Sequence, residues 1–105
     1  MLIKHKSQNF NLTPYKFPLT IKGLMLKIIK NDGALLIFKK EKLTALHTLF
    51  CFYKLDLIYL NENKEVTKIR KNILPFKLFI PYSKAKYILE LKTKNNIKVG
   101  DKLKF

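Results

Sequence analysis

Apolar residues in this chain occur in short runs between turn signals, a pattern typical of β-strands. Residues 55–60, LDLIYL, are the clearest example, and Asn-Glu-Asn-Lys follows as a hairpin turn. Leu55, Leu57 and Tyr59 would face one side of a sheet, and the even-numbered residues the other. Because several such runs recur along the chain, strands rather than helices must supply most of the fold.

Further strands, turns and a short helix are predicted along the rest of the chain. Pro18 near a helix start predicts a short helix or turn within 16–29, although Gly23 interrupts the apolar face. Pro75 and Pro81 predict an irregular, edge-like segment between them. Residues 39–43 are read as a charged loop. Strands are expected at 2–6, 34–38, 46–52, 55–60, 65–71, 86–91 and 102–105, and turns at 31–33, 61–64, 94–96 and 99–101. Residues 86–91 also fit a helix, and their β-rich neighbours favour the strand.

These elements predict one domain over residues 1–105, mainly β, with α+β as the alternative. The expected architecture is a small barrel- or sandwich-like antiparallel sheet of six to eight short strands, with one or two short helices. Hydrophobic residues make up 48% of the 105 residues, including 8 Phe and 5 Tyr, which is enough for a core without disulfides.

Cysteine and histidine are scarce. Cys51 is the single cysteine, so an intrachain disulfide and a four-cysteine zinc site are excluded. With only His5 and His47 besides, we expect no metal and no cofactor. The first residues carry charge but no apolar core of a signal peptide, and no apolar run approaches the ~20 residues of a spanning helix. We therefore expect a cytoplasmic protein without a membrane partner.

Charge is the most pronounced compositional feature, with 22 basic residues against 7 acidic ones and a net charge of +15. Such a field attracts polyanions, so nucleic acid is a candidate partner. The alternative is that A/T-rich codons have raised the lysine content without any partner. Arg70 is the only arginine, and lysine provides point-charge attraction rather than the bidentate contacts that read bases.

Three blocks resemble the family called domain of unknown function 192. They are KGLM at 22–25, LHTLFCFYKLDLIYL at 46–60, and LPFK, AKYILEL and IKVGD between 74 and 101. The second block is similar to an archaeal-type pattern, IHTFFM followed by PIDVVFLD. Order and spacing match from about residue 15 onward. The resemblance implies a compact β-rich fold with a short helical segment, and no known activity.

This chain departs from the family pattern at several positions. Cys51 stands where the family usually has Met, Lys54 where it has Pro, and Thr20 where Arg is frequent. The stretch between Leu91 and Ile97 is also shorter than usual. If relatives share a site, this copy has changed part of it, and the sequence does not distinguish a degenerate site from neutral change.

His47, Thr48 and Asp56 form the most promising polar cluster. On adjacent antiparallel strands, Asp56 would approach His47, orient its ring and raise its basicity. The alternative is that Asp56 is a carboxylate satisfied by backbone N–H groups or a lysine, while His47 bonds a loop. Cys51 lies between two phenylalanines and is read as core rather than as a nucleophile.

A second candidate group is Lys22, Gly23 and Met25, which would line a pocket if Gly23 lets the backbone approach a ligand. Alternatively, Gly23 ends a helical turn and Met25 fills the core. Residues 76–87 interleave aromatics with lysines, as single-strand nucleic-acid platforms do, or alternate them across a strand.

Three functions remain open, and no catalytic residue is assigned. The first is a non-catalytic binding module for an anionic ligand or a protein partner, using Lys22, Gly23, Met25, His47, Thr48 and Asp56. The second is a non-specific nucleic-acid binder. The third, ranked last, is an enzyme using His47 and Asp56, and we lean against it.

Overall fold

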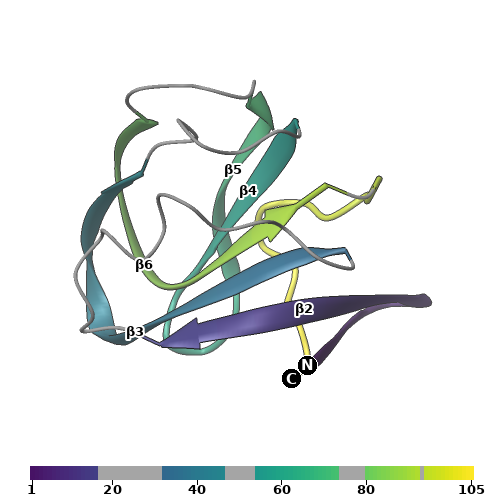
Figure 1. Ribbon diagram of the computed structural model, residues 1–105. Coiled ribbons are helices and arrows are strands. Elements are labelled where there is room, and N and C mark those ends of the chain that lie inside the picture. The colour runs from purple at the N-terminus through teal and green to yellow at the C-terminus, as the bar shows by residue number, and fades with distance from the viewer. Residues whose placement is uncertain (17–31, 47–53, 74–79, 93) are drawn as a thin grey trace.

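The computed structural model describes residues 1–16, 32–46, 54–73, 80–92 and 94–105. These residues form one curled six-stranded sheet of order β1-β2-β3-β6-β4-β5 (Figure 1). No helix occurs in these ranges, so none there could span a membrane. The strands are β1 (Leu2–His5), β2 (Gln8–Lys16), β3 (Gly33–Leu46), β4 (Leu55–Leu60), β5 (Val66–Ile73) and β6 (Ile80–Leu91).

Strand pairing is antiparallel except between β2 and β3. In that parallel pair, Leu12 lies beside Gly33 and Lys16 beside Ile37. A parallel pair needs a crossover connection, whereas antiparallel neighbours can be joined by a tight turn. The mainly β class and the small curled sheet are confirmed, and the parallel pair was not anticipated.

The core lies on both faces of the sheet. In β4, Leu55, Leu57 and Tyr59 pack into one cluster, and Ile58 and Leu60 pack into the other. The predicted alternation along this strand is therefore confirmed. The second cluster also includes residues that lie outside the strands. Its other buried members are Ile3, Phe10, Leu12, Leu35, Val66, Leu89, Leu91, Ile97 and Leu103.

The charged loop predicted at 39–43 is wrong, because β3 continues through it to Leu46. The charged residues in this range are typical of a loop, but their strand pairs with the backbone of β6. Lys42 lies opposite Ala85 and Leu43 opposite Lys84, after a register shift that follows Ile37. A bulge of this kind lets a long strand bend without leaving the sheet.

Two further expectations need correction. Pro81 lies inside β6 and not at the end of an irregular segment. Among the described residues, this part of β6 pairs with β3 and not with β4. Residues 102–105 form two isolated bridges instead of a strand. Phe105 is nevertheless seated against Tyr87, with ring centroids 5.0 Å apart in an edge-to-face arrangement.

Several predicted elements lie outside the described residues. They are most of the helix or turn at 16–29, the strand at 46–52 beyond Leu46, and most of the segment between Pro75 and Pro81. The turns predicted near 31–33, 61–64 and 99–101 are present at Asp32, at 62–63 and at 99–100.

Gly33 begins β3 with φ of +151°, and an added Cβ would lie 1.9 Å from the Glu90 carbonyl oxygen of β6. We expect Gly33→Ala to lower the free energy of unfolding by at least about 2 kcal/mol, because backbone strain and a backbone clash combine. Urea denaturation measures this loss. Gly100→Ala is the matched control, since Gly100 has φ of +96° with open space around it. Gly100→Ala should lower the free energy of unfolding by about 1 kcal/mol. Equal losses would contradict the close approach at Gly33.

Candidate functional site

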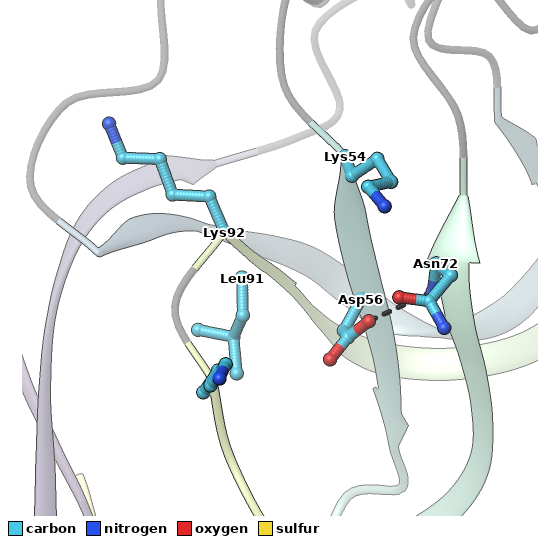
Figure 2. Close-up of a pocket in the computed structure, with 6 residues that line it drawn as sticks. Lys54, Asp56, Asn72, Leu91 and Lys92 are labelled. Atoms are coloured by element: carbon cyan, nitrogen blue, oxygen red, sulfur yellow. Dashed lines mark hydrogen bonds between the residues drawn. The ribbon is translucent and has the colours of Figure 1, made fainter.

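A pocket of about 250 Å³ lies at one end of the sheet, where β4 begins and β5 and β6 end (Figure 2). Because β4 runs antiparallel to both neighbours, its first residues lie beside their last ones. Leu55 is opposite Ile73, and Asp56 is opposite Leu91. The pocket is lined by Lys54, Asp56, Asn72, Leu91, Lys92 and Lys94.

The half-buried carboxylate of Asp56 is held by two donors. The Asn72 backbone N–H donates to Oδ1 and the Asn95 side-chain amide donates to Oδ2, both at 3.0 Å. Asn72 has φ of +56°, a conformation that asparagine tolerates better than most residues. Asn95 is fixed in turn, because its Oδ1 accepts a hydrogen bond from Ile97 N–H at 3.2 Å. Asp56 therefore organises the polar floor of the pocket.

Lysines surround this floor. Lys54, Lys92 and Lys94 are exposed and contribute to the lining. In Figure 2, the Lys54 side chain lies above Asp56 and turns toward Asn72, whereas the Lys92 side chain extends away from Asp56. The described pocket therefore combines three positive charges with one carboxylate, both of whose oxygens already accept hydrogen bonds.

Of the residues nominated from the sequence, the structure describes Asp56 alone. Lys22, Gly23, Met25, His47 and Thr48 lie outside the described residues, as does Cys51. The approach of His47 to Asp56 therefore stays a prediction. The alternative in which backbone N–H groups satisfy Asp56 agrees with the hydrogen bond from Asn72.

Sequence reasoning missed most of the pocket. The sequence marks Lys54 only as a departure from the family pattern. It predicts residues 94–96 only as a turn, and this prediction is wrong, because the structure has no turn at 94–98. Nothing local to Asn72 marks it, because its role depends on β5 ending beside β4. The signal that was available is the cluster of Lys92, Lys94 and Asn95 directly after a buried strand.

A second polar contact, between His5 and Asp101, was also not predicted. His5 is 1% exposed, and its Nε2 lies 2.7 Å from Asp101 Oδ2. Because an ionised carboxylate only accepts, His5 Nε2 is the donor in this hydrogen bond. The same oxygen accepts from Lys98 N–H at 2.9 Å. This contact fastens β1 to the turn at 99–100, far away in the sequence.

The hydrogen bond from Lys98 N–H, and then the one from His5, lower the pKa of the Asp101 carboxyl below its usual value. A depressed folded-state pKa contributes stability that is present above the unfolded pKa of about 3.9 and is lost as pH falls through the folded value. We expect wild type to be more stable than Asp101→Asn at pH 5, with the gap narrowing at pH 3. Urea denaturation at both pH values measures this gap in the free energy of unfolding, and a gap independent of pH would contradict the lowered pKa of the Asp101 carboxyl.

Removing the carboxylate of the pocket should destabilise the fold. Asp56→Ala leaves Asn72 N–H and the Asn95 amide without their acceptor, and we expect a loss of about 1–2 kcal/mol. Asp56→Asn keeps one carbonyl oxygen and should lose less. Lys54→Ala removes a neighbouring side chain without breaking either bond and serves as control. Wild-type stability of Asp56→Ala in urea denaturation would show that the two bonds contribute nothing net.

Comparison with solved structures identifies the fold. One match is a “putative transcription regulator” from Sinorhizobium meliloti 1021, with TM-score 0.79, 17% identity, and coverage of 98% of this chain and 89% of that one. Another is a protein of unknown function from Novosphingobium aromaticivorans DSM 12444, with TM-score 0.74, 21% identity, and coverage of 99% and 82%. At these identities the likeness concerns the fold alone.

A search of the curated proteins found no match. The model of the family DUF192, described as “Uncharacterized ACR”, matches residues 14–105. The match spans all three blocks from which the resemblance was drawn, although nothing in the comparisons bears out an archaeal-type form. This chain belongs to the DUF192 family.

Proposed function

We propose that this protein is a small, non-catalytic binding module that holds an anionic ligand in the pocket beside Asp56. The observation that carries the proposal is the set of lysines, Lys54, Lys92 and Lys94, around a floor whose carboxylate is already hydrogen-bonded. A protein partner presenting an acidic side chain would offer the same chemistry.

The charge balance of the pocket supports an anion. Asp56 uses Oδ1 for Asn72 and Oδ2 for Asn95, so it positions these residues instead of opposing a ligand with two free oxygens. The side chains of Lys54 and Lys94 are exposed and line the pocket, and hydrogen bonds between ions are stronger than neutral ones. The net charge of +15 adds a long-range field that draws anions toward the surface.

The pocket volume restricts the ligand to a small one. About 250 Å³ is slightly below the range of roughly 300–1,000 Å³ that holds larger organic ligands. Phosphate or a short dicarboxylate fits this volume and presents acceptor oxygens on several sides. Among the described lining residues Leu91 is the one apolar side chain, so we expect polar contacts to supply most of the affinity.

The enzyme alternative has less support. It requires a hydrogen-bonded His47–Asp56 pair, and His47 lies outside the described residues. The nucleic-acid alternative draws on the net charge of +15. The transcription-regulator description belongs to a structural neighbour at 17% identity and adds only a direction for testing. A cytoplasmic location stays an expectation.

The proposal is tested by isothermal titration of inorganic phosphate and of succinate into the protein. We expect millimolar binding that Lys54→Gln weakens about tenfold, because one charge-assisted contact is worth about 1.5 kcal/mol. The matched control is Lys68→Gln, which removes the same charge from an exposed position on β5.

Two results would count against the pocket. Equal weakening by Lys54→Gln and Lys68→Gln would attribute binding to net charge alone. Absence of heat with both anions at low ionic strength would leave the pocket without a ligand of the proposed class.

A further inference from the structure

Four exposed lysines lie on β1 and on the chain after Asp101. Lys4 and Lys6 alternate along β1 and the turn after it with the buried Ile3 and His5. On the other segment, Lys102 and Lys104 flank the buried Leu103. Since successive side chains of an extended segment point to opposite sides, Lys4, Lys102 and Lys104 point away from the core, and Lys6 is exposed in the turn. Lys4, Lys6, Lys102 and Lys104 are called the lysine quartet below.

Backbone pairing joins the two segments of the quartet. Lys4 N–H donates to the Lys104 carbonyl at 2.9 Å, and Lys104 N–H donates to the Lys4 carbonyl at 3.0 Å. Residues that exchange both bonds are directly opposite, so their side chains share one side of the ladder. Lys102 lies two residues before Lys104 on its segment, whereas Lys6 lies in the turn after β1, with φ of +53°. The directly opposite Lys4 and Lys104 therefore form the centre of the patch, with Cα atoms about 5.5 Å apart, and Lys102 lies on the same side about 7 Å from Lys104.

This arrangement is unfavourable for the isolated protein. Like charges directly opposite on paired strands destabilise the pairing. Among the described residues, no carboxylate forms an ion pair with any member of the quartet. Asp101 accepts from His5 and from Lys98 N–H and also attracts the charge of Lys6, while Glu65 lies directly opposite Lys102. These carboxylates offset charge at Lys6 and Lys102, so the unopposed positive field is centred on Lys4 and Lys104.

We propose that the lysine quartet binds the phosphate backbone of a duplex nucleic acid. Lysine supplies point charges that suit phosphates, whereas reading base edges or splayed bases calls for arginine or aromatic side chains. On the two segments that carry the quartet, no outward-facing residue is aromatic, and Leu2 is the one apolar outward-facing residue. Four lysines beside one apolar side chain favour contact with closely spaced phosphates over insertion into a lipid surface. The quartet shares no residue with the pocket at Asp56.

The test titrates the full chain with labelled duplex DNA and duplex RNA of equal length between about 50 and about 200 mM salt. Each lysine–phosphate contact contributes about 0.9 to the slope of log K against log salt. We expect Lys4→Gln with Lys104→Gln to reduce the slope by about two for the duplex that binds. Lys68→Gln with Lys71→Gln removes the same charge from exposed positions of β5 and should leave the slope unchanged.

Thermal unfolding separates binding from folding. Lys104→Glu places an opposite charge beside Lys4, so we expect a melting temperature at or above the wild-type value together with weaker duplex binding. Equal slope losses for both double variants would overturn the quartet and leave diffuse charge as the cause. No duplex binding at low salt would also overturn it, as would binding to phosphatidylserine vesicles in place of duplexes. None of these results bears on phosphate binding by Lys54, so the two proposals fail separately.

Discussion

The central position of β6 is the constraint on which the rest of the structure depends. One edge of this strand pairs with β3 and the other edge, near its end, pairs with β4. Without β6 the sheet would separate into β1-β2-β3 and β4-β5. Its alternating residues reach both core clusters, with Ile88 on one face and Leu89 on the other. The close approach of Gly33 to Glu90 follows from this pairing, because the two backbones meet where β3 begins.

The pocket follows from the same arrangement. Since β4 is antiparallel to both β5 and β6, its first residues meet the last residues of both partners. A register shift between the Leu55–Ile73 and Leu57–Arg70 pairs leaves Asn72 outside the regular ladder, and its N–H donates to Asp56 instead. The chain leaving β6 then places Lys92, Lys94 and Asn95 around the carboxylate. The polar contacts of the pocket and its positive charge thus both arise because β5 and β6 end beside the start of β4.

The two ends of the described chain meet on the other side of the fold, where N and C lie close together in Figure 1. The backbone bonds between Lys4 and Lys104 and the contact between His5 and Asp101 hold β1 against the last residues. The inward side of this junction is buried and paired, while the outward side carries only lysines and Leu2. A junction that is stable on one side therefore presents unbalanced charge on the other.

Local sequence determined β4 with its two-sided alternation, the turn after Leu60, the mainly β class and the family resemblance, because a period of two residues and turn chemistry are short-range properties. Tertiary structure alone decided the parallel pairing of β2 with β3, the continuation of β3 to Leu46, and the contact of His5 with Asp101. It also decided which polar residues join Asp56. Asn72 acquires its role through a positive φ at the end of β5, and Asn95 because the chain after β6 brings its side-chain amide to Asp56. Such partners are set by strand order and register, which depend on pairing between distant segments and leave no periodic signal in the residues themselves.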